Sequence, residues 1–301
     1  MTTLDLKRIY SVKNGLLEGP RWDDRTQAVV FSDARNGGVL SLDATGKLDT
    51  VIAHRRGIGG IALHESGGCV VTGRNVAYKA YDKVGEVQPT VVLIERDELN
   101  HRVGFNDLTT DARGRVYVGS MAFVALHEDI DDPKLRAGEF WMIDTDGTVK
   151  CVAQDIRVSN GTAMSADGKT LYLSDSSRRA VFSFSADLET GKLGPRSVLL
   201  ETPAGVPDGM AVAQDGSIWI TLAYAGKIIR YTGEGKVIEE FDIPDKMVTS
   251  VCFGGVDGRT LYVVTGVPND KPQEEAHVYT VRVDVAGVPI HRAKTPTQAA
   301  P

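Results

Sequence analysis

Four side chains with carboxylate or amide oxygens begin similar β-rich stretches in different parts of this chain. They are Glu18 in "EGPRW", Asn106 in "NDLTT", Asn160 in "NGTAM" and Asp208 in "DGMAV". Such oxygens are the ligands that Ca²⁺ and Mg²⁺ prefer, whereas Cys and His, which zinc usually requires, do not occur at these positions. If the fold brings the four side chains together, they predict a site for one divalent cation.

The stretches that carry these residues belong to an internal repeat of six units. Each unit has a short strand, a tight turn at a pair such as Asp-Gly, Gly-Gly or Arg-Gly, and a second strand rich in Val, Tyr, Ile and Trp. Tight turns between such runs indicate β-hairpins. The first residues of the units follow one another at intervals of 41 to 54 residues: Glu18, Gly59, Asn106, Asn160, Asp208 and Thr249.

This spacing predicts an all-β fold, a six-bladed β-propeller with four-stranded antiparallel blades. One small sheet cannot cover both of its faces, whereas six sheets arranged around an axis cover one another. We expect a single domain in which a strand at 6–12 joins the last blade and closes the ring, residues 122–139 form an inserted loop, and residues 289–301 form a flexible tail. The approximate blades are 18–58, 59–105, 106–159, 160–207, 208–248 and 249–288.

In a propeller the innermost strand of every blade starts at the same end of the central channel. The first residues of the units are therefore expected to surround one mouth of the channel. Two carboxylates held close together there repel each other unless a cation lies between them. The plainer interpretation is that Asn-Gly and Asp-Gly are ordinary turn pairs without a function. Their repetition at equivalent positions favours a site.

The composition is that of a soluble globular protein and excludes several classes of partner. The net charge is −6 and no basic run occurs, so nucleic acid is not an expected partner. No apolar stretch is long enough to span a membrane, and the N-terminal segment lacks the apolar core of a signal peptide. Cys69, Cys151 and Cys252 match no disulfide or metal spacing, so we expect buried free thiols and a cytoplasmic protein.

Four longer motifs resemble those of the SMP-30/gluconolactonase/luciferin-regenerating-enzyme family. They are "LLEGPRW", "GFNDLTTDARGRVYVGSM", "VSNGTAMSADGKTLYLSDS" and "PDGMAVAQDGSIWI". The resemblance extends from about Leu16 to Val263 and implies a six-bladed propeller with the activity of a metal-dependent lactonase or a related esterase. It further implies that Glu18, Asn160 and Asp208 are metal ligands and that Asn106 contacts the substrate.

The chain departs from this family at positions that contact a sugar. The sugar-lactonase members have an Arg two residues before the Asn of "FND", where this chain has Gly104, and an acidic residue where it has Phe123. Arg102 is a candidate to reach the site from a shifted loop. The change favours a less polar lactone or ester, with Phe105, Phe123 and Tyr224 as candidate walls of the substrate site.

We therefore expect a metal-dependent hydrolase that opens a sugar lactone or a less polar γ- or δ-lactone by attack of an activated water. Its cofactor is one divalent metal ion, with Ca²⁺ first and Mg²⁺, Mn²⁺, Fe²⁺ or Zn²⁺ as alternatives. Asp208 is the first choice for the base and Glu18 the second, whereas Asn106 is suited to donate a hydrogen bond to the developing oxyanion. Two alternatives stay open: an esterase or organophosphate hydrolase on the same scaffold, and a non-enzymatic propeller that binds Ca²⁺ or another ligand.

Other candidate nucleophiles and bases lie outside the ring of first residues. None of the six histidines begins a unit, although His101 and His127 lie in loops that could overhang the mouth. No Gly-x-Ser-x-Gly motif occurs, which disfavours a serine hydrolase. The glycine pairs follow no phosphate-binding pattern, so nucleotide binding is not expected.

Overall fold

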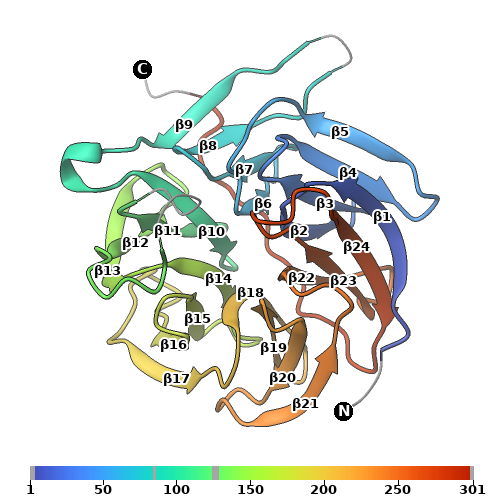
Figure 1. Cartoon of the computed structure of the whole chain (residues 1–301). Coiled ribbons are helices and arrows are strands. Elements are labelled where there is room, and N and C mark those ends of the chain that lie inside the picture. Colours follow the sequence, from blue (N-terminus) through green and yellow to red (C-terminus); the bar gives the residue numbers. More distant parts are fainter. Residues whose placement is uncertain (1–3, 84–85, 124–128, 299–301) are drawn as a thin grey trace.

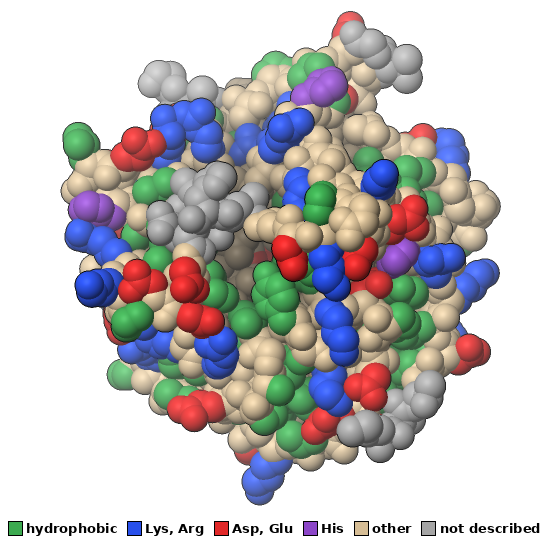
Figure 2. Space-filling model, viewed as in Figure 1, with side chains coloured by type: hydrophobic (Ala, Val, Ile, Leu, Met, Phe, Trp, Pro, Cys, Tyr) green, Lys and Arg blue, Asp and Glu red, His purple; other side chains and the backbone are tan. Residues whose placement is uncertain are grey.

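The computed structural model describes residues 4–83, 86–123 and 129–298, and these residues form six antiparallel sheets arranged around a central axis (Figure 1). Each sheet has four strands, which confirms the predicted six-bladed propeller. A hollow opens near the middle of the ring, where a cavity of about 530 Å³ lies (Figure 2). No helix among the described residues is both long enough and apolar enough to cross a membrane.

Five blades follow one another along the chain, each with its first strand innermost. The first blade consists of β2 (Leu17–Asp23), β3 (Ala28–Asp33), β4 (Val39–Asp43) and β5 (Leu48–Ile52). The second consists of β6 (Ile61–Leu63), β7 (Cys69–Val71), β8 (Val76–Lys79) and β9 (Thr90–Ile94), and a short 3₁₀ helix, η1 (Glu98–Asn100), follows it. The third consists of β10 (Gly104–Thr110), β11 (Val116–Met121), β12 (Gly138–Ile143) and β13 (Val149–Ile156). The fourth consists of β14 (Ser159–Met164), β15 (Thr170–Asp175), β16 (Ala180–Ser185) and β17 (Ser197–Glu201). The fifth consists of β18 (Val206–Val212), β19 (Ile218–Ala223), β20 (Lys227–Tyr231) and β21 (Val237–Asp242).

The sixth blade combines three strands from the C-terminal part of the chain with one strand from the N-terminal part. It contains β22 (Val248–Gly254), β23 (Thr260–Thr265), β24 (Glu275–Arg282) and β1 (Lys7–Lys13). Strand β1 pairs antiparallel with β24, with Ser11 opposite His277. This pairing confirms that an N-terminal strand closes the ring.

The core of the protein lies between the blades. Each of six clusters of buried side chains joins two neighbouring sheets, as the cluster between the fifth and sixth blades illustrates. There Trp219 of β19 stacks on Phe241 of β21 at 5.2 Å and contacts Phe253 of β22 edge-on at 5.7 Å. Removing such a buried aromatic side chain costs about 3–5 kcal/mol of stability. The mutual burial explains why short strands, which are unstable alone, form a stable ring.

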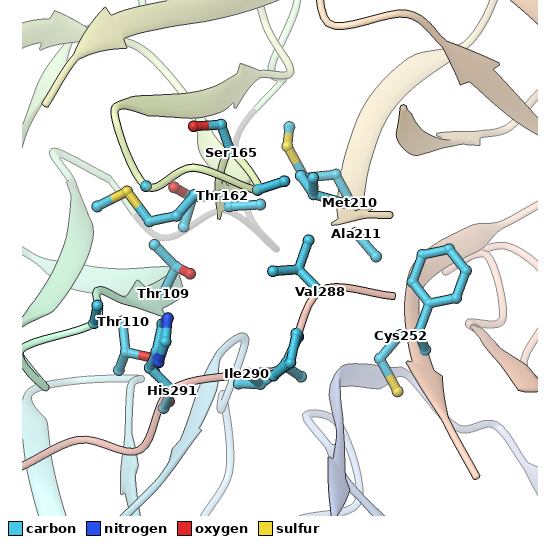
Figure 3. Close-up of a pocket in the computed structure, with 18 of the residues that line it drawn as sticks. Thr109, Thr110, Thr162, Ser165, Met210, Ala211, Cys252, Val288, Ile290 and His291 are labelled. Carbon is cyan, nitrogen blue, oxygen red and sulfur yellow. Dashed lines mark hydrogen bonds between the residues drawn. The ribbon is translucent and has the colours of Figure 1, made fainter. Parts of the chain in front are cut away.

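We expected residues 289–301 to form a flexible tail. The described residues of this segment are instead hydrogen-bonded to the propeller. The segment crosses the end of the channel opposite to the cavity of Figure 2, and we call residues 286–296 the strap. Its Val288 N–H donates to the carbonyl oxygen of Val212 at 3.0 Å, and its Ala293 N–H donates to that of Leu63 at 2.8 Å. Figure 3 shows Val288 and Ile290 facing the inner strands across a cavity of about 190 Å³. Carbonyl oxygens at the edges of the inner strands gain hydrogen-bond donors in this way. The composition of the segment did not indicate this contact.

The cysteines also differ from the expectation in one respect. Cys69 and Cys252 are buried, and burial raises the pKa of each thiol to about 12. Cys151, which we expected to be buried as well, is exposed because β13 is the outermost strand of its blade. All three are free thiols.

Candidate functional site

The four oxygen-bearing side chains singled out in the sequence meet at one mouth of the central channel. Glu18 of β2, Asn106 of β10, Asn160 of β14 and Asp208 of β18 all line the cavity of about 530 Å³. They come from the innermost strands of four different blades, separated by up to 190 positions along the chain. The repeat therefore predicted correctly which distant residues the fold brings together.

Each of these residues lies at an irregularity of its strand. Between Pro207 and Met210 the pairing of β18 with β19 shifts, which places Asp208 in a β-bulge. A bulge leaves one residue unpaired and turns its side chain away from the regular alternation. The same shift occurs in the other three strands, between Glu18 and Arg21, between Phe105 and Leu108, and between Ser159 and Thr162.

The second blade contributes a glycine in place of a polar side chain. A Cβ atom added to Gly59 would lie 1.9 Å from Oδ1 of Asn106, closer than any real contact allows. Gly59 therefore leaves the space that the Asn106 amide occupies at the mouth.

Two carboxylates, Glu18 and Asp208, lie near each other at this mouth, and one of them has an oxygen without a partner. Asp208 is 6% exposed, and its Oδ1 accepts no hydrogen bond from the described residues. Burial raises the pKa of Glu18 well above its usual range, and the charges of Asp208 and Asp107 raise it further. Burial and then Asp107 also raise the pKa of Asp208, although hydrogen bonds from Gly209 and Asn160 act in the opposite direction. Such a pair needs a positive charge to remain ionised.

Hydrogen bonds from one N–H of each group fix the orientation of both amide side chains. Nδ2 of Asn160 donates to Oγ of Ser176 at 3.2 Å, and this hydroxyl donates to the carbonyl oxygen of Pro207 at 2.7 Å. Nδ2 of Asn106 donates to the carbonyl oxygen of Ser159 at 3.0 Å. The amide oxygens are left to act as ligands or acceptors. The sequence pattern did not single out Ser176. Its position at the end of the strand motif "LYLSDS" could have indicated that it lies near the mouth.

The chemistry of this set fits a cation that prefers oxygen ligands. Glu18, Asn160 and Asp208 offer two carboxylates and one amide, and no histidine or cysteine lines the described part of the cavity. Within the described ranges, no three His, Cys, Asp or Glu side chains converge to hold a metal ion. A metal site here therefore needs the amide oxygen of Asn160 as its third protein ligand, and Ca²⁺ readily binds amide oxygens.

The aromatic residues expected as walls all line the same cavity. Phe105 and Phe123 are buried, and Tyr224 is half exposed. Other apolar side chains extend this wall, namely Leu16, Val103, Met121, Ile130, Val158, Val206 and Met247. The insertion that carries Phe123 lies between β11 and β12, where the sequence predicted it.

Arg102 does not reach the site, contrary to our expectation. Its Nε donates to the carbonyl oxygen of Glu95 at 3.1 Å, and its guanidinium lies 4.9 Å above the ring of Trp141. These contacts hold the side chain between the outer parts of the second and third blades. Three other arginines line the cavity, and none of them belongs to the repeated positions: Arg35, Arg56 and Arg74.

Histidines take no part in the described site. None of His54, His64, His101, His277 and His291 lines the cavity, while His127 lies outside the described residues. His277, for example, bonds through Nδ1 to Asp245 at 2.7 Å.

Comparisons with known proteins agree with the fold. A family model described as "SMP-30/Gluconolactonase/LRE-like region" matches residues 16–267. The regucalcin of Gallus gallus is 30% identical over 88% of this chain and 88% of its own length. A pentonolactonase of Haloferax volcanii is 29% identical over 87% of this chain and 85% of its own. A solved luciferin-regenerating enzyme, 25% identical, superposes with a TM-score of 0.84 over 95% of this chain and 99% of that one.

Proposed function

The chain belongs to the SMP-30/gluconolactonase/LRE-like family, and from this membership and the site described above we propose that it is a metal-dependent hydrolase that opens lactones. The observation that carries the proposal is the convergence of Glu18, Asn160 and Asp208, with an unpartnered oxygen of Asp208, at the base of a cavity with apolar walls. The relative named as a pentonolactonase supports the class of reaction.

The three residues proposed to hold the cation are Glu18, Asn160 and Asp208, with Ca²⁺ as the first choice. A solved structure with the same fold, 19% identical, is named a calcium-binding protein, and the choice of ion for this chain rests on the oxygen ligands at its mouth. When bound, a divalent cation supplies a Lewis acid for the ester carbonyl. Its positive charge also offsets the repulsion between the two carboxylates.

Side chains of this protein accept the proton, stabilise the oxyanion and position the substrate. Asp208 accepts a proton from the attacking water, whose oxygen forms the new bond to the acyl carbon, with Glu18 as the second candidate for this role. The ring C–O bond then breaks, and the ring oxygen takes a proton and becomes the hydroxyl of a hydroxy acid. Asn106 uses one N–H on Ser159, so its second N–H remains to stabilise the oxyanion. Phe105, Phe123 and Tyr224 hold the carbon skeleton and exclude bulk water.

The test is hydrolysis of a panel of γ- and δ-lactones by protein treated with a chelator and then reconstituted with each divalent metal. We expect turnover to be lost on chelation and restored by Ca²⁺. The Asp208→Asn variant should lose about 100-fold or more in kcat because it lacks the proton acceptor. Full turnover after thorough metal removal would contradict the metal dependence. Tight Ca²⁺ binding without hydrolysis would favour a binding protein, and hydrolysis of aryl esters alone would favour an esterase.

A further inference from the structure

The cavity is divided into an acidic base, an apolar wall and a basic side. Glu18 and Asp208 form the base, and Arg35, Arg56 and Arg74 lie on the side formed by the first two blades. Figure 2 shows Lys and Arg side chains along the upper side of the hollow, above the sheets β2–β5 and β6–β9. Among the described lining residues, three cationic side chains thus accompany two carboxylates.

The loops that carry these arginines are fixed by backbone hydrogen bonds. The Gly57 N–H donates to the carbonyl oxygen of Ala34 at 2.8 Å, next to Arg56 and Arg35. The Gly73 N–H donates to the carbonyl oxygen of Phe105 at 3.2 Å, and the Phe105 N–H donates to the carbonyl oxygen of Gly73 at 2.8 Å. These two bonds fix Gly73, which directly precedes Arg74. The arginines therefore belong to the rigid rim of the site.

No carboxylate among the described residues neutralises these three guanidinium groups. Arg56 and Arg74 are exposed, and neither side chain makes an ion pair or a hydrogen bond within the described part of the chain. Arg35 is half-buried, and its guanidinium group donates only to uncharged acceptors. These are Oδ1 and the carbonyl oxygen of Asn14 at 2.9 and 3.5 Å, the carbonyl oxygen of Val267 at 2.8 Å and Oδ1 of Asn269 at 2.8 Å. The Arg35 guanidinium is therefore held in place without an ion pair to any described residue, and the side chains of Arg56 and Arg74 are able to bind a ligand.

We propose that the substrate is a lactone with an anionic substituent, a carboxylate or a phosphate monoester, which Arg56 and Arg74 bind while the ester group lies at Glu18, Asn160 and Asp208. This inference rests on the proposed function and adds the class of substrate. Guanidinium groups bind carboxylate and phosphate oxygens through paired N–H donors. The fixed charge of Arg35 adds to the attraction for an anion.

The experiment compares three lactones with the same ring that differ only in one substituent: a hydroxymethyl group, a carboxylate or a phosphate monoester. The wild-type protein should show a kcat/KM about tenfold or more higher for one of the anionic lactones than for the neutral one, since a charge-assisted hydrogen bond contributes about that factor. The Arg56→Gln/Arg74→Gln double variant should lower this ratio about tenfold. Arg259→Gln, an exposed arginine on the opposite face, serves as the control and should leave the ratio as in the wild type. The two anionic arms distinguish a carboxylate from a phosphate.

A second readout does not require turnover. Calorimetry on chelator-treated and on Ca²⁺-loaded protein measures the Kd of the three ring-opened acids. We expect tighter binding of the acids with the additional anion in both forms, and loss of this preference in the double variant. A wild-type ratio near one, or a preference that survives the double substitution, would overturn the inference while lactone hydrolysis itself stands. If no lactone is hydrolysed, the proposed function fails, and the calorimetric preference still decides whether the arginines bind an anion.

Discussion

Two buried aspartates of this propeller have opposite surroundings, and exchanging each for asparagine tests whether the mouth is built for a cation. Asp208 has an oxygen without a partner and lies near Glu18 and Asp107. Asp111, near the other end of the channel, is bound to Arg115 at 2.6 Å and also accepts from the Tyr117 hydroxyl at 3.2 Å. Asparagine has the volume of aspartate but no charge. The two substitutions should therefore change stability in opposite directions.

The magnitudes follow from these contacts. An unsatisfied buried polar atom costs about 1–3 kcal/mol, so we expect Asp208→Asn to stabilise the metal-free protein by about 1–2 kcal/mol. In a chain of this size that raises the Tm by about 2–5 °C. Asp111→Asn breaks an ion pair whose side chains are both 2% exposed, which costs about 3 kcal/mol or more. Its Tm should fall by about 6 °C.

The assay is thermal unfolding of the wild type and both variants, in a chelator and in Ca²⁺. At a Ca²⁺ concentration of about 100 times Kd, the wild type should gain about 2.7 kcal/mol, and Asp208→Asn should gain much less because it has lost a ligand. Asp111→Asn should keep the full gain. If Asp208→Asn is as destabilising in the chelator as Asp111→Asn, or if it keeps the full response to Ca²⁺, the interpretation of the mouth as a cation site is refuted.

Three further predictions concern other parts of the molecule. Gly59→Ala should lower lactone kcat/KM about tenfold or more, because its methyl group would displace the Asn106 amide, and an unchanged rate would show that this amide is not needed. In the native protein a thiol reagent should modify Cys151 rapidly and the two buried cysteines only after unfolding; a Cys151→Ser variant that still reacts rapidly would contradict this. Arg292→Ala should lower stability in urea by about 1–3 kcal/mol, since Arg292 binds the buried Asp23 at 2.6 Å, and a loss no larger than that of the exposed Arg282→Ala would argue against a role of the strap in stability.

The sequence predicted the ring of site residues because the propeller repeats one local pattern in every blade. Four residues could be aligned without knowledge of the structure, since each lies within the first three residues of an innermost strand: Glu18, Asn106, Asn160 and Asp208. What the pattern did not reveal is the form of the local backbone. The pairs Asn-Gly at 160–161 and Asp-Gly at 208–209 lie in β-bulges within strands, and not in the reverse turns that such pairs usually indicate.

The arginines and the strap could not be predicted by the same means. Arg56 and Arg74 lie in connections whose lengths vary from blade to blade, so alignment of the units does not bring them together. A shifted loop would be needed for Arg102 to take the place of the arginine missing at Gly104, yet a nearby carbonyl oxygen and Trp141 bind Arg102 elsewhere. The strap makes its contacts with residues more than 70 positions away, such as Val212 and Leu63, and its Pro and Ala content is typical of a disordered end.

The strap also affects how molecules enter and leave the protein. Residues 286–296 lie across one end of the channel and Asp208 lines the cavity at the other end, so we expect a compound bound at Asp208 to reach solvent through the cavity of Figure 2, by the path along which it arrived. The hydroxy acid formed in the proposed reaction must then depart before another lactone can bind. Because product and substrate then share one site and one path, we expect the product to inhibit competitively with the substrate.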